Sequence, residues 1–209
     1  MMRTLCLQAP SFDGFDGGAG SRYQARREIR SFWYPTWLAQ VAAAVPGSKL
    51  VDSAPHRLTL ADVVGMARNY DLAVLHTSTP SFASDVRVVE ALKEANPQLK
   101  VGFVGAKVAV EPEASLKGSP AIDFVAGNEF DFTIRQVAEG RDWSGIDGLS
   151  YREASGTIRH NPPRAMLANM DELPFVTPVY KRDLSIENYF IGYLKHPYIS
   201  LYTLSLIHI

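Results

Sequence analysis

The sequence predicts an α/β fold, a doubly wound parallel sheet with helices on both faces. Two observations favour it. Short apolar runs alternate with helix-like segments four to five times between residues 1 and 140. The run DLAVLHT, residues 71–77, is apolar at consecutive positions, as expected for a strand that is buried on both faces. In such a sheet the crossovers are right-handed, and a ligand binds at the carboxyl ends of the strands.

The first third of the chain is predicted to supply two strands and two helices. RTLCLQAP contains a short strand that ends at Pro10, and a Gly-rich loop, SFDGFDGGAGSRYQARR, follows it. A helix begins near Pro35, since apolar residues then recur at helical spacing, and Pro46-Gly47 ends it. KLVDS is the second strand, and residues 58–70 form the second amphipathic helix.

The strand at residues 71–77 opens a second series of elements. Thr79 as the cap and Pro80 in the first turn predict the start of a third helix, which ends at Asn96-Pro97. KVGFVGA is the next strand and IDFVAG, residues 122–127, the one after it. Residues 129–139 then form a helix with an apolar inner face.

The pattern changes after Gly140. Two short strand-like runs flank Ala154-Ser155-Gly156, which indicates a β-hairpin, and the Pro-rich stretch MDELPFVTPVYKRDL is typical of an irregular linker. We therefore expect a Rossmann-like domain over residues 1–140, followed by a hairpin and linker over residues 141–196.

Composition excludes several classes of protein. The formal net charge of the 209 residues is -1, which gives no basic field for unspecific nucleic-acid binding. The single cysteine, Cys6, rules out a disulfide framework and a multi-cysteine metal site within this sequence. No stretch approaches the roughly 18 apolar residues that a membrane span needs. A cytoplasmic protein without a transmembrane segment is expected.

Topology selects the candidate site residues, because the loops after the strands meet at one edge of the sheet. These loops cover residues 10–22, 53–57, 77–81, 105–108 and 127–130. The richest in polar groups is Thr77 to Ser81, where hydroxyls and helix-start amides suit the polar edge or a phosphate of a ligand. A helix cap without a ligand explains the same residues.

Other polar residues have two interpretations each. The loop glycines from Gly14 to Gly20 match neither dinucleotide nor P-loop spacing, so a plain loop is favoured over a phosphate cradle. Asp52 and His56 follow the second strand and form a candidate metal or catalytic pair, or an ordinary surface pair. His76 is expected to be a core or crevice-edge histidine. Lys107 suits a receiver domain, but that class needs carboxylates after the first strand, where this chain has Gln-Ala-Pro.

Five segments occur in a fixed order: LCLQAPSFDGFDGG, YPTWLAQVAAAVPG, DLAVLHTSTPSFASDV, KVGFVGA, and DFVAGNEFDFTIRQVAEG with GLSYRE after it. Together with the DELPFVTP linker, they resemble the N-terminal cobalamin-binding domain of B12-dependent radical S-adenosylmethionine (SAM) enzymes. The resemblance extends from residue 1 to about residue 203. Within that class, these sequence segments most resemble the radical SAM proteins associated with hopanoid biosynthesis.

The resemblance implies that cobalamin lies over the carboxyl edge of the sheet, with its nucleotide tail beside the strands. The positions that match cofactor-binding positions of the class are Thr77, Ser78, Thr79, Gly105, Gly127 and Glu129. The resemblance assigns neither a catalytic residue nor a cobalt ligand, since Asp52-Ser-Ala-Pro-His56-Arg57 departs from the DxHxxG spacing. It implies a hopanoid lipid as substrate of the full-length parent, and hence a location in the cytoplasm or peripheral to a membrane.

The class continues with a barrel strand like HPYISLYT and then a CxxxCxxC motif, which holds a four-iron, four-sulfur cluster. Here Thr203 is followed by LSLIHI, and three thiolates cannot come from Cys6. Residues 197–203 are therefore predicted to be the first strand of a truncated radical SAM barrel, and residues 204–209 an aberrant tail. A frameshift or assembly artefact is our hypothesis for that tail. The fragment is expected to bind cobalamin without turning over S-adenosylmethionine.

Two alternatives remain open at this point. One is a stand-alone module that binds cobalamin or another small ligand. The other is half of a glycosyltransferase that binds a nucleotide sugar, which shares the doubly wound sheet. The fold alone does not separate these functions.

Overall fold

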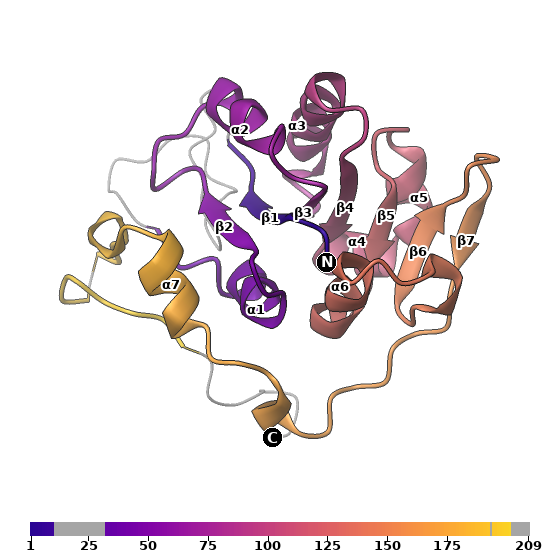
Figure 1. Ribbon diagram of the computed structural model, residues 1–209. Coiled ribbons are helices and arrows are strands. Elements are labelled where there is room, and N and C mark those ends of the chain that lie inside the picture. The colour runs from indigo at the N-terminus through magenta and orange to yellow at the C-terminus, as the bar shows by residue number, and fades with distance from the viewer. Residues whose placement is uncertain (11–31, 193, 202–209) are drawn as a thin grey trace.

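One seven-stranded sheet organises the molecule, in the order β2-β1-β3-β4-β5-β6-β7 (Figure 1). The computed structural model describes residues 1–10, 32–192 and 194–201. Strands β1 to β5 run parallel, and β6 and β7 add an antiparallel hairpin beside β5. The doubly wound fold predicted from the sequence is confirmed. The strands are β1 Thr4–Gln8, β2 Lys49–Asp52, β3 Leu72–His76, β4 Lys100–Val104, β5 Phe124–Ala126, β6 Leu149–Arg152 and β7 Ile158–His160.

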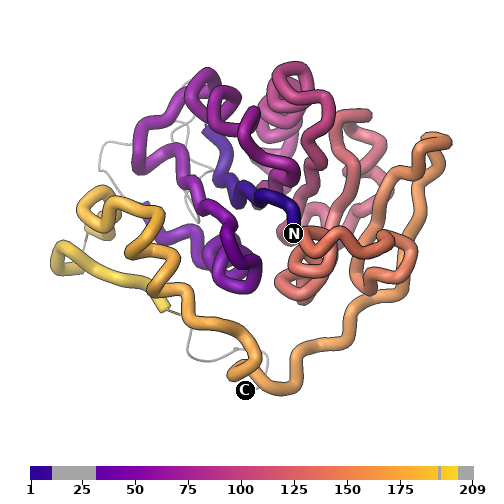
Figure 2. Tube along the Cα trace, viewed as in Figure 1, coloured from indigo at the N-terminus to yellow at the C-terminus, as the bar shows by residue number. Residues whose placement is uncertain are grey.

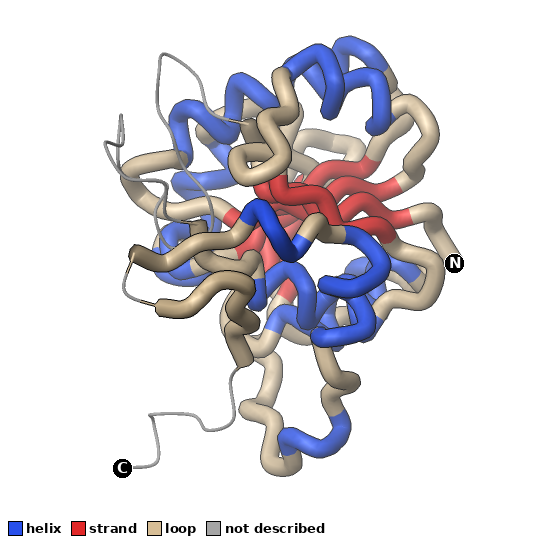
Figure 3. The backbone as a smooth tube through the Cα atoms, turned by 90° about the vertical axis from the view of Figure 1, so that its left-hand side faces the viewer, coloured by secondary structure: helices blue, strands red, loops and turns tan. Residues whose placement is uncertain are grey.

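Helices cover both faces of the sheet, as the edge-on view in Figure 3 shows. One face carries α1 (Thr36–Ala44), α6 (Phe130–Ala138) and α7 (Thr177–Asp183), whose apolar residues share a core. The other carries α2 (Leu60–Ala67), α3 (Phe82–Ala95), α4 (Ala106–Val110) and α5 (Pro112–Lys117). Three short 3-10 helices, η1 (Trp143–Gly145), η2 (Met170–Glu172) and η3 (Ile186–Asn188), lie in the connections after α6.

In strand β3, consecutive apolar residues face two different cores. Leu72 and Val74 point into the core below α1 and α6, whereas Ala73 and Leu75 point into the core below α2 and α3. All four side chains are fully buried. A central parallel strand is covered on both faces, so its sequence is apolar at every position rather than at every second one.

Strand β4 is shaped by a close approach to its neighbour. Gly102 pairs in register with Phe124 of β5. A Cβ atom on residue 102 would lie 2.1 Å from the Phe124 ring, so this ring crosses the strand where only glycine leaves room.

The third helix begins later than predicted. Helix α3 starts at Phe82 with Ser81 as its N-cap, so Thr79 and Pro80 precede it in a turn and the predicted cap at Thr79 is wrong. The reason is local. The Ser78 carbonyl accepts the N–H groups of Ser81 and Phe82, and the Ser78 and Ser81 hydroxyls lie 2.8 Å apart. Residues 78–81 therefore close their own turn before the helix begins.

Three helices escaped prediction. Helices α4 and α5 have five and six residues, too few turns to display a helical period. Helix α7 lies within MDELPFVTPVYKRDL. The prediction of an irregular linker over this stretch is therefore wrong for the residues of the helix. Pro178 sits in its first turn, where proline is tolerated because that N–H has no partner inside the helix.

The chain after β7 returns across the helix layer to the opposite edge of the sheet (Figure 2). Helix α7 then lies beside the edge strand β2, and the Asp183 carboxylate accepts the outward N–H of Leu50 at 2.8 Å. The hairpin and α7 therefore pack on the same sheet as residues 1–140. The division into domains at residue 140 stays a prediction.

Four tyrosines hold the last described residues against the start of α1. Tyr34 stacks on Tyr189 with ring centroids 4.2 Å apart, and contacts Tyr180 and Tyr198 at 4.5 and 5.4 Å. The Tyr198 hydroxyl donates to the Phe32 carbonyl at 2.7 Å. Residues 197–201 form no strand in the described part of the chain, and residues 202–209 lie outside it. The predicted barrel strand at 197–203 stays a prediction.

Candidate functional site

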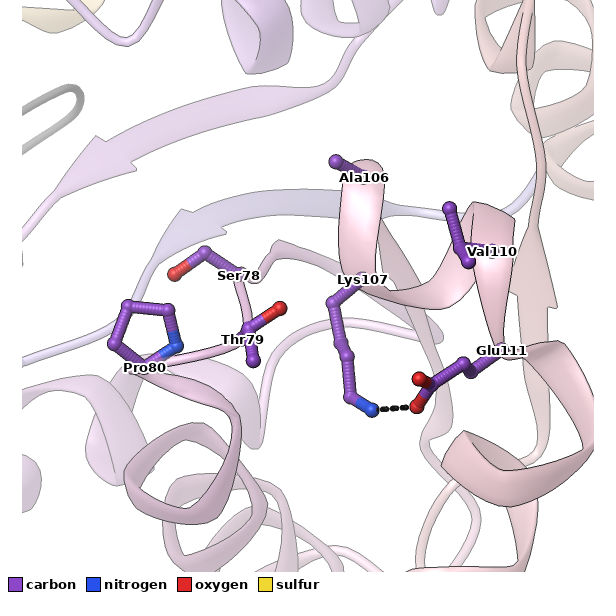
Figure 4. Close-up of a pocket in the computed structure, with 7 residues that line it drawn as sticks. All are labelled: Ser78, Thr79, Pro80, Ala106, Lys107, Val110 and Glu111. Carbon is purple, nitrogen blue, oxygen red and sulfur yellow. Dashed lines mark hydrogen bonds and ion pairs between the residues drawn. The ribbon is translucent and has the colours of Figure 1, made fainter.

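The carboxyl edge of the sheet carries a pocket where the loops after β3 and β4 meet (Figure 4). Its volume is about 460 Å³, within the range of small-ligand pockets. Both loops come from adjacent parallel strands, so the topology itself places them side by side. The residues that line the pocket are Ser78, Thr79, Pro80, Ala106, Lys107, Val110 and Glu111.

Thr77, the first predicted site residue, does not line this pocket. Its side chain is buried, and its hydroxyl donates to the buried carboxylate of Asp85 at 2.7 Å. Its backbone N–H donates to the Val104 carbonyl at 2.9 Å. Thr77 therefore anchors the loop after β3 to helix α3 and to β4, and this fixes the position of Ser78 and Thr79.

Gly105, the first residue after β4, brings the two loops into contact. Its φ is 117°, a conformation that residues with a side chain rarely adopt. A Cβ atom there would lie 2.4 Å from the Thr77 carbonyl oxygen. His76 ends β3 half-buried beside this glycine, which agrees with a histidine at the crevice edge.

Lys107 and Glu111 are the two charged residues that line the pocket. Their side chains form an ion pair between successive turns of the α4 region, as Figure 4 shows. The Lys107 ammonium also lies 5.6 Å from the centre of the Phe82 ring, within reach of a cation–π contact. The sequence places Lys107 in the candidate loop at residues 105–108 and in the receiver alternative, whereas Glu111 is not identified from the sequence. Its i,i+4 spacing from Lys107 would have identified it, had a helix been predicted there.

Gly127 and Glu129 lie farther along the same edge, after β5, and do not line this pocket. The Gly127 N–H donates to the Gly148 carbonyl at 2.9 Å. Glu129 has a left-handed backbone with φ of 57°, and its carboxylate accepts the Leu167 N–H at 3.4 Å. The structure thus brings Ser78, Thr79 and Gly105 together and leaves Gly127 and Glu129 at a neighbouring loop.

Asp131, in the first turn of α6, was not identified from the sequence. Its Oδ1 is enclosed and makes no hydrogen bond within the described part of the chain, although the residue as a whole is partly exposed. This loss of solvent, with a smaller contribution from Glu129, raises the pKa of Asp131 to about 7. An aspartate in a first helical turn is common, so no sequence signal distinguishes it.

Asp52 and His56 form a structural pair. The Ser185 N–H donates to His56 Nε2 at 3.0 Å, so the ring proton is on Nδ1, which donates to the Asp52 carbonyl at 2.8 Å. The Asp52 carboxylate accepts the Tyr189 hydroxyl at 3.0 Å. With both ring nitrogens occupied, His56 is not available as a metal ligand, and the described residues contain no group of three or more such ligands.

The predicted loop at residues 10–22 lies almost entirely outside the described residues, including Gly14 to Gly20. Within the described ranges, no helix combines the length and apolar character needed to cross a bilayer. Cys6 is fully buried in β1, and burial raises the pKa of its thiol to about 12. A thiol of this kind is inert, so Cys6 contributes no chemistry to the site.

Comparison with known proteins agrees with the fold. The cobalamin-dependent S-adenosylmethionine radical enzyme OxsB, with aqua-cobalamin and S-adenosylmethionine bound, superposes with a TM-score of 0.62 at 12% identity, over 79% of this chain and 23% of that one. With aqua-cobalamin alone, OxsB gives 0.58 at 13% identity over the same shares. Apo OxsB gives 0.57 at 14% identity, over 70% of this chain and 22% of that one. The fold is therefore the Rossmann-like fold found in OxsB.

A relative in sequence is a protein of Pyrococcus horikoshii described as an uncharacterized methyltransferase. It is 32% identical over 158 residues, which are 71% of this chain. The chain spans about a third of the length of this relative, 34%, and less of the OxsB chains. No protein-family model matches the chain.

Proposed function

We propose that the chain binds cobalamin at the carboxyl edge of its sheet, as the cofactor-binding part of a cobalamin-dependent radical SAM enzyme that transfers methyl groups. The observation that carries the proposal is the likeness over 79% of the chain to OxsB, which was solved with aqua-cobalamin bound. The methyltransferase relative supports the reaction class.

The groups that line the pocket support the proposal, because they suit part of a corrinoid. Such a ligand is amphiphilic, with an apolar ring and tail base, a rim of amides, and a phosphate in the tail. Ser78 and Thr79 supply hydroxyls, Lys107 a cation, and Pro80 with Val110 apolar surface. Gly105 adds a stretch of backbone without a side chain beside them. These groups would hold the cofactor, and we propose that Gly127 and Glu129 contact it from the next loop.

When bound, cobalamin supplies one-carbon transfer chemistry at its cobalt. The residues of this chain would bind and orient the cofactor, and His56 is not assigned as a cobalt ligand, since both of its ring nitrogens are engaged. The iron–sulfur cluster and the S-adenosylmethionine site belong to the parent enzyme in this proposal, because one cysteine cannot hold the cluster. The hopanoid lipid substrate also stays a prediction from the sequence resemblance, and neither relative is named for a lipid.

A spectral titration tests the proposal. Adding hydroxocobalamin to the chain is expected to shift the corrinoid absorbance with a saturable, one-to-one stoichiometry. Thr79→Phe, at an exposed pocket position, is expected to weaken binding at least about tenfold because the ring occupies the ligand's space. Thr157→Phe, at the exposed turn of the hairpin, is the matched control and should bind normally.

Two results would contradict the proposal. Folded protein that leaves the absorbance unchanged would exclude corrinoid binding, and equal weakening by both variants would place the ligand elsewhere. Saturable binding of a nucleotide sugar instead would favour the glycosyltransferase alternative.

A further inference from the structure

Lys107 is held in the pocket on two sides, while its partner is not. Its side chain is 17% exposed, between the Phe82 ring and the Glu111 carboxylate. The Glu111 side chain is 53% exposed. The carboxylate can therefore turn outward into water at little cost, whereas the Lys107 side chain, which lines the pocket, stays largely enclosed. An incoming anion would replace Glu111 as the partner of Lys107.

Only one part of a cobalamin carries a negative group of this kind. The amide side chains of the corrin ring are neutral, and the nucleotide tail contains a phosphodiester. Cobinamide, a corrinoid without the nucleotide tail, lacks that charge. A partly buried ammonium distinguishes such ligands well, because an ion pair with a phosphate is stronger where water is partly excluded.

We propose that Lys107 is the residue that makes this site select complete corrinoids over cobinamides, by pairing with the tail phosphodiester in exchange for Glu111. The proposal rests on the cobalamin-binding function and adds its specificity. Ser78 and Thr79 line the same pocket as Lys107, and Thr79 is exposed there, so its hydroxyl is the one left to donate to a bound phosphate, since the Ser78 hydroxyl lies 2.8 Å from that of Ser81 (Figure 4). Lys107 thus acts through charge, and Pro80 and Val110 act through apolar contact with the rest of the tail.

The test compares the affinities of hydroxocobalamin and cobinamide for the full chain and three variants. Lys107→Gln is expected to weaken cobalamin binding about tenfold, the value of one charge-assisted hydrogen bond, and to leave cobinamide binding unchanged. Glu111→Gln frees the ammonium and should strengthen cobalamin binding alone. Lys117→Gln is the matched control, because Lys117 forms the same i,i+4 pair with Glu113 but lies outside this pocket.

Salt provides an independent readout. The preference of the wild type for cobalamin should fall as ionic strength rises, and Lys107→Gln should lose most of this dependence. Thermal unfolding of each variant checks that it is folded.

The outcomes separate the two proposals. If the wild type binds both corrinoids equally, or if Lys107→Gln and Lys117→Gln change the preference alike, the role of Lys107 is wrong and corrinoid binding stands. If the folded wild type binds neither ligand, the cobalamin-binding function fails, and the role of Lys107 fails with it.

Discussion

At the scale of single residues, Gly105 has the most demanding position. Its φ is 117°, and a methyl carbon on this residue would lie 2.4 Å from the Thr77 carbonyl oxygen, so no side chain fits without movement. Gly105→Ala is expected to lower the free energy of unfolding by roughly 2–3 kcal/mol, from backbone strain and the clash together. Urea denaturation measures this change.

Gly140 provides the control for that experiment. Its φ is 78°, but nothing lies within 4 Å of a Cβ atom there. Gly140→Ala therefore carries the strain without the clash and should cost about 1 kcal/mol. Equal losses in the two variants would show that the contact between the loops after β3 and β4 is not tight.

The raised pKa of Asp131 predicts that the stability of the protein depends on pH. Because burial raises its pKa from 3.8 to about 7, the folded state holds a proton that the unfolded state releases. The stability contributed by this group is complete below its unfolded pKa and declines as pH rises through about 7. Asp131→Asn should therefore stabilise the protein near pH 8 by on the order of 1–3 kcal/mol, and by less near pH 5.

Asp142 is the opposite case and serves as the comparison. Its exposed carboxylate accepts the N–H and hydroxyl of Ser144, and these bonds lower its pKa. Asp142→Asn should not stabilise the protein at high pH. Urea unfolding at the two pH values measures both variants, and an Asp131→Asn effect that is independent of pH would contradict the burial of its charge.

At the scale of elements, Asp183 fastens helix α7 to the edge of the sheet. Burial alone would raise the pKa of Asp183, but hydrogen bonds from Arg182, the Leu50 N–H and Lys49 outweigh it and hold the pKa below 3.8. Asp183→Asn retains one acceptor and presents an NH₂ group to the remaining donors. We expect the free energy of unfolding to fall by about 1–3 kcal/mol. The loss is no larger because Lys49 and Arg182 are half exposed, and solvent weakens their ion pairs with Asp183.

The sign of the pH effect follows from the lowered pKa. The contribution of Asp183 is present above the ordinary value of 3.8 and is lost as pH falls through the lower folded value. Glu113→Gln, which breaks an exposed pair with Lys117, should change the urea midpoint little. If Asp183→Asn and Glu113→Gln changed the urea midpoint equally, the role of Asp183 in holding α7 against β2 would be contradicted.

The elements that could be predicted from the sequence are those with a strong period. The five parallel strands and helices α1, α2, α3 and α6 each display apolar spacing along several residues. Helices α4 and α5 are too short for that, and α7 is hidden by prolines. The start of α3 was misplaced because the Ser78–Ser81 turn depends on hydroxyl contacts that spacing does not reveal.

The candidate site was predictable in place but not in detail. Topology located the loops after β3 and β4 at one edge, and the structure confirms that they meet there. The burial of Thr77 depends on Asp85, eight residues away, and the enclosure of Asp131 depends on tertiary packing. Neither follows from residue order, because both result from contacts between separate elements.

At the scale of the whole molecule, the strand order reverses between the adjacent strands β1 and β3, from which the chain continues to β2 on one side and to β4 on the other. Ligands of open α/β sheets bind at the carboxyl ends beside this point. At the β2 edge, Asp183 bonds to Leu50, and Tyr180, Tyr189 and Tyr198 pack against Tyr34. The pocket between the loops after β3 and β4 rests on strands whose side chains are buried on both faces.

The central claim is that cobalamin binds at the carboxyl edge, and hydrogen exchange with and without hydroxocobalamin tests it most directly. We predict slower amide exchange in residues 77–81 and 105–111, with no change in residues 96–99, which connect α3 to β4 at the amino edge. Protection confined to the amino edge or to strand β7, in protein that has bound the corrinoid, would contradict the account.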